Sequence, residues 1–353
     1  MNIARLDPRA SSWWMFGPLW CLAGLLFGTT AMAASQPLTV EAAVEAQARV
    51  LSQANAAVVG VRTIAVEDAS SAKTLGPVRQ GSGVVIGADG LVLTIGYLII
   101  EAENVELHLA GARVIPARVV AYDVATGFGL VQALAPLKLP PVRLGDAAAL
   151  SSEEPLMIAS GGDDGDVSIA RMVSRRPFSG YWEYHIDGAL FTSPPRTDHS
   201  GAALFNGRGE LMGIGSLIVM NAMGDNHPRV PGNMFVPVDL LKPILAELRE
   251  RGSSSSSHRA WMGVNCVEYN GQVRVTRVSE DSPAEQAGLR PGDHIMRIDG
   301  AEVSGLEMLW KSLWRGDKAE REVTLDVRRG DTSKTFKVQA VDRMTTLRRA
   351  KGI

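Results

Sequence analysis

The chain has 353 residues, which is enough for two or three domains with substantial hydrophobic cores. Hydrophobic residues make up 46% of the sequence and charged residues 21%, as in ordinary globular proteins. The formal net charge is −2, so composition offers no basic surface for nucleic acid.

The first residues have the three parts of a secretory signal peptide. Arg5 and Arg9 precede an apolar run over 13–27, and small residues follow over 29–34. We therefore predict a leader over 1–33 and a periplasmic location, with an uncleaved inner-membrane anchor as the alternative. Cleavage would remove Cys21 and leave Cys266 as the one cysteine, which excludes an internal disulfide.

Beyond the leader, one short helix is expected over 39–52, followed by many short apolar runs separated by turn residues. This pattern is typical of an all-β barrel or sandwich. A second helix is predicted over 238–251, with Pro243 in its first turns, where a missing N–H is tolerated. The expected strands and turns lie at 58–61, 83–86, 88–90, 91–94, 114–120 and 206–209.

A run of five serines marks the domain boundary. Residues 252–258 are predicted to form a flexible polar linker, and the 85 or so residues beyond it suit a small α+β module. The predicted division is a signal peptide over 1–33, a first domain over 34–251, the linker over 252–258, a second domain over 259–342 and a tail over 343–353.

Five segments of the first domain resemble, in order, the HtrA/Deg family of periplasmic proteases. They are 80–94, 119–126, 197–204, 209–214 and 233–238. The resemblance implies a mostly β fold, with a trypsin-like double six-stranded β-barrel followed by a PDZ domain.

The second domain resembles PDZ domains over 261–264, 282–293 and 295–300. PDZ domains capture a C-terminal carboxylate on backbone N–H groups and add the peptide as an extra strand. The resemblance assigns this role to Met262, Gly263 and Val264. The alternative is a PDZ fold whose groove is occluded or packs on a neighbour.

The resemblance also locates the catalytic triad, and two of its three positions are altered. Ser200 matches the nucleophile, but Tyr97 stands at the histidine position and Gly127 at the aspartate position. A tyrosine has a pKa near 10 and cannot replace imidazole as a proton shuttle. Asp123 is interpreted as a turn residue rather than a substitute carboxylate.

The oxyanion loop also departs from the family pattern. Asp198 replaces the usual glycine beside His199, Ala202 replaces the second glycine, and 192–196 reads as an insertion. This change puts in doubt the loop shape that an oxyanion hole requires. A recruited His185 is the alternative base, because His199 is adjacent to Ser200 and its side chain should point away, while His108 lies on a strand expected to face solvent.

No cofactor or metal is predicted. The acidic run over 161–166 lacks the glutamate at the twelfth position of a calcium loop, so we interpret it as a solvated turn between strands.

Two functions follow from these observations. The first is an exported pseudoprotease whose PDZ domain binds unfolded proteins or C-terminal carboxylates as a sensor, adaptor or holdase. The alternative is an active serine endopeptidase that uses Ser200 with an unconventional base. Homo-oligomers, or mixed oligomers with HtrA-type proteins, are further candidate partners, although residues 34–60 lack the aromatic residues through which the family often trimerises.

Overall fold

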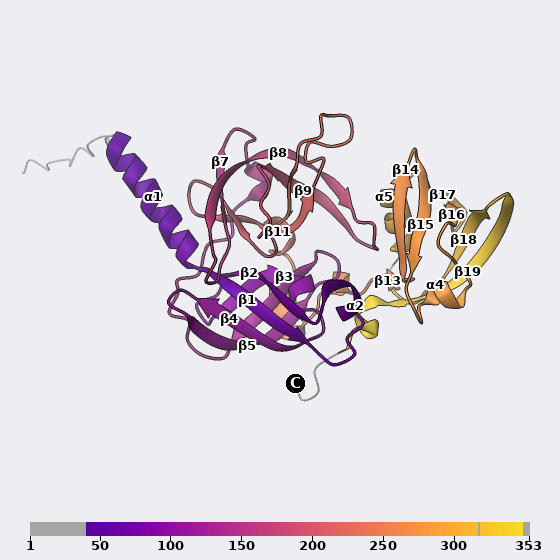
Figure 1. Cartoon of the computed structure of the whole chain (residues 1–353), viewed down its shortest axis with the longest axis horizontal. Coiled ribbons are helices and arrows are strands. Elements are labelled where there is room, and N and C mark those ends of the chain that lie inside the picture. Colours follow the sequence, from indigo (N-terminus) through magenta and orange to yellow (C-terminus); the bar gives the residue numbers. More distant parts are fainter. Residues whose placement is uncertain (1–39, 317, 349–353) are drawn as a thin grey trace, which may run out of the picture.

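The computed structural model describes residues 40–316 and 318–348. Its first element is α1 (Val40–Ala56), which begins where the sequence predicts a helix and runs four residues further. In Figure 1 this helix projects away from the rest of the chain. The predicted leader over 1–33 lies outside the described residues. Among the described helices, none has the length and hydrophobicity needed to cross a membrane.

Residues 58–133 form a closed six-stranded antiparallel barrel in the order β1-β2-β3-β6-β5-β4. Its interior is filled by side chains such as Val59, Leu93, Leu107 and Phe128, none of which is more than 1% exposed. The short helices α2 (Ala72–Leu75) and η1 (Gly96–Leu98) lie in its connections. The strands are β1 (Val58–Ala65), β2 (Val78–Val85), β3 (Leu91–Ile95), β4 (Ala102–Leu109), β5 (Arg113–Tyr122) and β6 (Phe128–Ala133).

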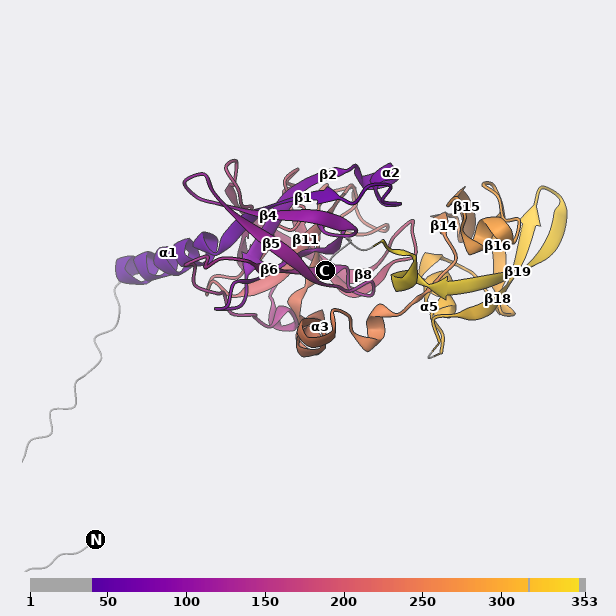
Figure 2. The same ribbon diagram turned by 90° about the horizontal axis from the view of Figure 1, so that it is seen from below.

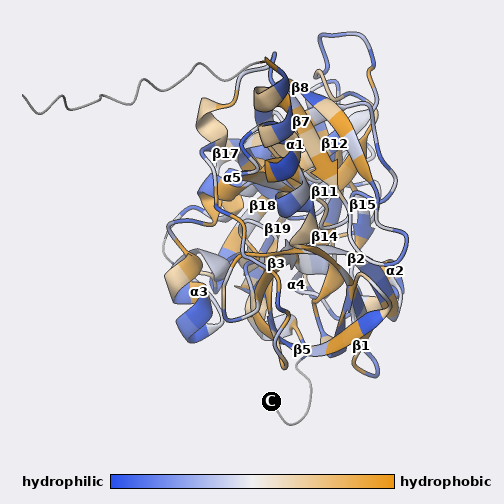
Figure 3. Ribbon diagram, turned by 90° about the vertical axis from the view of Figure 1, so that its left-hand side faces the viewer, coloured by the Kyte–Doolittle hydropathy of each residue, from blue (hydrophilic) through white to orange (hydrophobic). Residues whose placement is uncertain are grey.

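A second closed barrel follows in the order β10-β11-β12-β9-β8-β7, with η2 (Ala147–Ala149) before it. The two barrels confirm the predicted trypsin-like fold. Figure 3 shows hydrophobic residues concentrated in the barrel strands. The strands are β7 (Pro155–Ala159), β8 (Val167–Ser179), β9 (His185–Ser193), β10 (Ala203–Phe205), β11 (Leu211–Val219) and β12 (Gly232–Pro237).

The helix predicted over 238–251 is shorter than expected. The structure has a 3₁₀ turn, η3 (Val238–Leu240), and then α3 (Leu245–Arg251). Pro243 lies between the two, where its missing N–H removes a helical hydrogen bond. Gly252 ends α3 in the left-handed conformation at φ +77°.

Residues 260–342 form the PDZ domain, a curled sheet in the order β13-β19-β18-β16-β15-β14, with β17 paired to β16. The helices α4 (Pro283–Gln286) and α5 (Leu306–Leu313) accompany the sheet, and Trp310 of α5 is fully buried. The domain lies at the opposite end of the molecule from α1 (Figure 2). Its strands are β13 (Ala260–Trp261), β14 (Val264–Tyr269), β15 (Gln272–Val278), β16 (His294–Ile298), β17 (Ala301–Glu302), β18 (Arg321–Arg329) and β19 (Thr332–Asp342).

The serine-rich segment between the domains is ordered, which corrects the prediction of a flexible linker. Ser254 and Ser257 cap the short helix η4 (Ser255–Ser257) and are 1% and 0% exposed. Both hydroxyls donate to Oδ1 of Asp123, at 3.1 and 2.5 Å. A buried carboxylate needs such donors, so the serines are tied to the first barrel. The last element that the structure describes is η5 (Arg343–Thr346), which follows β19 directly.

Candidate functional site

The loop that carries Ser200 packs tightly against strand β2. The backbone N–H of Ser82 donates to the carbonyl of Ser200 at 2.8 Å. Gly201 has φ +74°, and a Cβ built there would lie 2.0 Å from the carbonyl oxygen of Ser82. The glycine that follows Ser200 is therefore required by the close approach of two backbones, whether or not the serine reacts.

Tyr97 reaches Ser200 from η1, at the position that the resemblance assigns to the histidine. Its hydroxyl oxygen lies 2.8 Å from Ser200 Oγ and 2.8 Å from the carbonyl oxygen of Ser216. A carbonyl oxygen can only accept a hydrogen bond. Both contacts are therefore satisfied when the Tyr97 hydroxyl donates to Ser216 and the Ser200 hydroxyl donates to the Tyr97 oxygen. Burial raises the pKa of Tyr97 to about 12, against a lowering by the Ser200 hydrogen bond. The phenol is thus a hydrogen-bond partner for Ser200 but not a base.

Gly127, which the resemblance assigns to the aspartate position, has φ +79° and immediately precedes β6. The space beside it is taken by Tyr184, because a Cβ on Gly127 would lie 3.0 Å from the Tyr184 hydroxyl oxygen. That hydroxyl donates to the carbonyl of Thr126 at 2.8 Å. Asp123 is fully buried and accepts the N–H of Thr126 at 2.8 Å, so it forms the turn that the sequence predicts. Gly127 therefore supplies no carboxylate at the aspartate position of the triad, and the carboxylate of Asp123 belongs to this turn.

The oxyanion loop is held by charged side chains. Asp198 accepts hydrogen bonds from Arg196 and Ser160. Partial burial acts to raise the pKa of Asp198, but the hydrogen bonds from Arg196 and Ser160 lower it overall. Arg196 is fixed in turn by buried Asn233, which accepts its N–H at 2.7 Å and donates to its carbonyl at 2.9 Å. The segment 192–196 is therefore held in place by side-chain hydrogen bonds at Arg196.

His185 and His199 make their hydrogen bonds away from Ser200. Nδ1 of His185 lies 2.8 Å from Ser179 Oγ and its Nε2 lies 3.1 Å from Asp187. Nδ1 of His199 lies 3.2 Å from the carbonyl of Arg196, and burial lowers the pKa of this histidine. Within residues 40–316 and 318–348, neither ring hydrogen-bonds with Ser200.

One small cluster has donor atoms close enough to share a cation. Atoms of His185, Asp187 and Glu307 lie within 4.8 Å of one another. Lys311 already pairs with both carboxylates of this cluster, since its Nζ donates to Asp187 at 3.0 Å and to Glu307 at 2.7 Å. The contacts join β9 to α5 and so help to hold the two domains together. The acidic run over 161–166 connects β7 to β8, with Asp163 and Asp164 exposed as predicted.

The PDZ loop for which the sequence predicts carboxylate binding, residues 262–264, connects β13 to β14. Gly263 has φ +88°, and a Cβ there would lie 2.3 Å from Cβ of Ser282, so only glycine fits. The N–H groups of Met262 and Gly263 both donate to Oε1 of Glu183, at 2.8 and 3.0 Å. Val264 follows as the first residue of β14, and its N–H also favours the charged form of Glu183. The predicted loop is therefore in contact with a carboxylate from its own chain.

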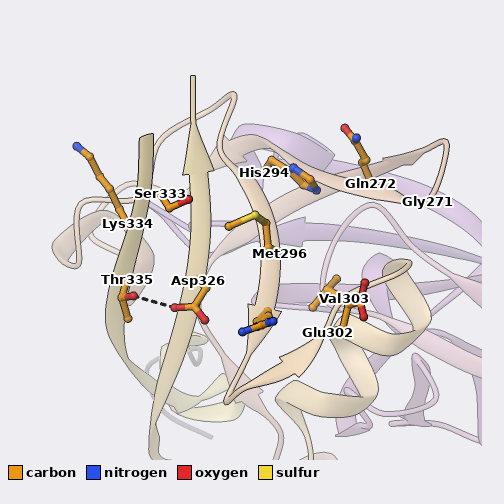
Figure 4. Close-up of a pocket in the computed structure, with 11 residues that line it drawn as sticks. Gly271, Gln272, His294, Met296, Glu302, Val303, Asp326, Ser333, Lys334 and Thr335 are labelled. Atoms are coloured by element: carbon orange, nitrogen blue, oxygen red, sulfur yellow. Dashed lines mark hydrogen bonds between the residues drawn. The ribbon is translucent and has the colours of Figure 1, made fainter. Parts of the chain in front are cut away.

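Figure 4 shows a separate pocket of about 690 Å³ on the PDZ domain. Its lining comes from β15 to β19 and includes Met296, Asp326 and Thr335, whose hydroxyl donates to Asp326 at 2.8 Å. Neither β14 nor α5 contributes to it, so this pocket is distinct from the predicted carboxylate loop and the strand that follows it.

Comparison with known proteins agrees with both domains. The trypsin-like peptidase domain family matches residues 81–214, and the PDZ domain family matches residues 260–340. A probable periplasmic serine endoprotease DegP-like from Pseudomonas putida is 29% identical over 278 residues, covering 72% of this chain and 55% of its own length. The corresponding protein of Ectopseudomonas mendocina is 30% identical and covers 70% and 54%. The chain thus spans about half the length of these curated relatives.

Solved structures show the same fold. The HtrA-type protease AlgW with decapeptide has a TM-score of 0.52 at 19% identity, covering 84% of this chain and 98% of that one. The serine endoprotease from Yersinia pestis has a TM-score of 0.50 at 20% identity, covering 84% and 97%. The chain is a trypsin-like domain joined to a PDZ domain. With these homologues, it belongs to the HtrA-type family.

Sequence reasoning missed two residues of the site, Glu183 and Tyr184. Both lie in the loop over 180–184 that joins β8 to β9, one facing the PDZ loop and the other Gly127. The segment reads Gly-Tyr-Trp-Glu-Tyr, and three aromatic residues in a connecting loop were a signal of burial against another surface. Nothing in the sequence showed which surface that was.

Proposed function

We propose that this protein is a non-catalytic HtrA-type protein that binds unfolded or C-terminal peptides through its PDZ domain in the bacterial envelope. It would act as a sensor, adaptor or holdase, which needs binding contacts but no proton transfer. The observation that carries the proposal is the contact between Tyr97 and Ser200.

A serine hydroxyl reacts only when a base takes up its proton. The partner of Ser200 is a phenol whose pKa is raised to about 12, so it remains protonated at neutral pH and cannot accept that proton. Loss of the base costs on the order of a millionfold in kcat in serine proteases. Gly127 adds a second deficit, because an imidazole at position 97 would lack a carboxylate to orient it.

The oxyanion loop supports the same conclusion. An oxyanion hole needs free N–H groups aimed at one point. The position where the family has glycine is here taken by Asp198, whose carboxylate Arg196 and Ser160 hold in place. A carboxylate held at this loop opposes, rather than stabilises, a negative charge that develops beside it.

The PDZ domain, by contrast, keeps the parts that peptide binding requires. The N–H groups of Met262 and Gly263 converge on one carboxylate oxygen. Strand β14 lies at the end of the sheet order, where an added strand can pair. Relatives in the solved structures carry bound peptides, namely AlgW with a decapeptide and with a tripeptide.

The test is a comparison of the purified protein with its Ser200→Ala variant on unfolded casein. We expect no cleavage beyond the level of the variant at any pH from 6 to 9. Cleavage that disappears in Ser200→Ala would establish the alternative, an endopeptidase with an unconventional base. Retention of casein by the uncleaving protein, measured by light scattering during aggregation, distinguishes a holdase from a narrower C-terminal sensor.

A further inference from the structure

The loop over 180–184 of the second barrel occupies the peptide-binding edge of the PDZ domain. It makes three kinds of contact there. The Glu183 carboxylate accepts from Met262 and Gly263 as described above. The carbonyl of Tyr181 accepts the N–H of Cys266 in β14 at 2.6 Å. The indole N–H of buried Trp310 in α5 donates to the carbonyl of Gly180 at 3.0 Å.

These contacts are those that a bound peptide would make. A PDZ ligand places its terminal carboxylate on the N–H groups of the loop and pairs its backbone with the edge strand. Here Glu183 supplies the carboxylate and Tyr181 supplies a backbone carbonyl to β14. The side chain of an internal glutamate therefore stands in for a chain end.

The loop is anchored on its other side as well. Trp182 stacks on Tyr184 with ring centroids 5.4 Å apart, and Tyr184 reaches the space beside Gly127. At the end of the loop, Asp187 pairs with Lys311 of α5 at 3.0 Å. One short segment thus fills both the carboxylate loop of the PDZ domain and the position of the missing triad aspartate.

We propose that the segment Gly180–Tyr184 is an intramolecular ligand of the PDZ domain, which a peptide with a free C-terminal carboxylate must displace in order to bind. The proposal rests on the peptide-binding function proposed above and adds the form of its regulation. The apparent affinity for a peptide equals the affinity of the open groove multiplied by the fraction of molecules whose groove is open.

The contacts of Glu183 also define which chemical groups a competing peptide must have. Displacement requires an extended chain with a terminal carboxylate, because that group must replace Glu183 on the N–H groups of Met262 and Gly263. An amidated peptide end lacks the negative charge, and charge-assisted hydrogen bonds are about twice as strong as neutral ones. We therefore expect strong discrimination between the two forms of one peptide.

Occupancy is tested first without any peptide, by hydrogen exchange at individual backbone amides of the full chain. In Glu183→Ala, the amides of Met262 and Gly263 should exchange at least tenfold faster than in the unaltered protein. Glu250→Gln changes an exposed glutamate in α3 and should leave them unchanged. Equal exchange at these two amides in the unaltered protein and Glu183→Ala overturns the proposal.

Displacement is tested with a pool of randomised decapeptides that end in a free carboxylate, and with the same pool amidated. Glu183→Ala should retain at least tenfold more of the carboxylate pool than the unaltered protein, and Glu183→Gln an intermediate amount. Equal retention by all three proteins contradicts the intramolecular ligand while leaving peptide binding intact. Retention by none contradicts peptide binding itself, and the exchange experiment still decides whether Glu183 occupies the loop.

Discussion

The Ser200 site and the PDZ loop over 262–264 differ in the groups on which their chemistry depends. At the first, the backbone geometry around Ser200 is kept by Gly201, but the partner is a phenol that cannot take a proton. At the second, the N–H donors of Met262 and Gly263 are intact and already hold a carboxylate. A site loses chemistry when one titratable group changes, whereas a site made of backbone N–H groups survives as long as its glycine does.

The largest expected effect is on the triad side of this comparison. Gly127→Asp places a side chain at φ +79° and 3.0 Å from the Tyr184 hydroxyl. Strain and crowding together should lower the free energy of unfolding by about 2–4 kcal/mol. Gly111 has φ +76° with nothing within 4 Å, so Gly111→Asp should cost only about 1 kcal/mol. Denaturant unfolding of the two variants measures the difference, and equal losses would show that Tyr184 does not fill the aspartate position.

The serine segment that joins the two regions gives the next effect. Ser257→Ala removes a donor from the buried carboxylate of Asp123 and should cost about 1–3 kcal/mol of stability. Ser255 is exposed in the same short helix, and Ser255→Ala should stay within about 0.5 kcal/mol. Thermal unfolding of both variants tests this, and a flexible linker would give the same small change for each.

The two regions also differ in how far the sequence could predict them. Strand spacing predicted an all-β first domain, and the family resemblance carried by the ordered motifs predicted the two barrels and the PDZ domain, which the structure confirms. The assignment of Tyr97 and Gly127 to the triad positions rests on the same resemblance and stays a prediction. The docking of Glu183 and the burial of Ser254 and Ser257 depend on which surfaces meet across the domain boundary. A polar serine run and a lone glutamate have the same local signature whether exposed or buried, so sequence alone predicted a flexible linker there.

Protein stability should also depend on pH through Glu183, which contacts the PDZ loop. Burial raises the pKa of Glu183 to about 7, above the ordinary 4.5, while hydrogen bonds from Met262 and Gly263 oppose the shift. Arg343 of η5 also lowers this pKa, and Cys266 of β14 is the neighbouring thiol, whose own pKa the burial raises. The folded state therefore holds a proton that the unfolded state has released between about pH 4.5 and 7.

The free energy of unfolding therefore decreases as the pH rises. The contribution of Glu183 is fully present below pH 4.5 and is lost as pH rises through about 7, so stability relative to Glu183→Gln should fall by about 2–3 kcal/mol between pH 5 and 8. Melting temperatures of the two proteins across this range provide the measurement. Parallel curves would mean that the Glu183 carboxyl group is solvated rather than docked.

The smallest effect is at Tyr97. Tyr97→Phe removes the phenol that contacts Ser200 and the carbonyl of Ser216, and should cost about 0.5–1.5 kcal/mol. Proteolysis should remain absent, since no base is gained. An increase in casein cleavage in this variant would mean that the phenol restrains a working serine rather than replacing a lost histidine.

The most direct measurement of the whole account is fluorophosphonate labelling of Ser200, read by mass spectrometry. It should be made on the unaltered protein, on the Glu183→Ala variant, and on the unaltered protein with the carboxylate peptide pool. We expect no adduct at Ser200 in any of the three, because opening the PDZ loop supplies no base. An adduct that forms when Glu183 is removed, or when peptides are added, would show a latent protease released by its PDZ domain and would contradict the account.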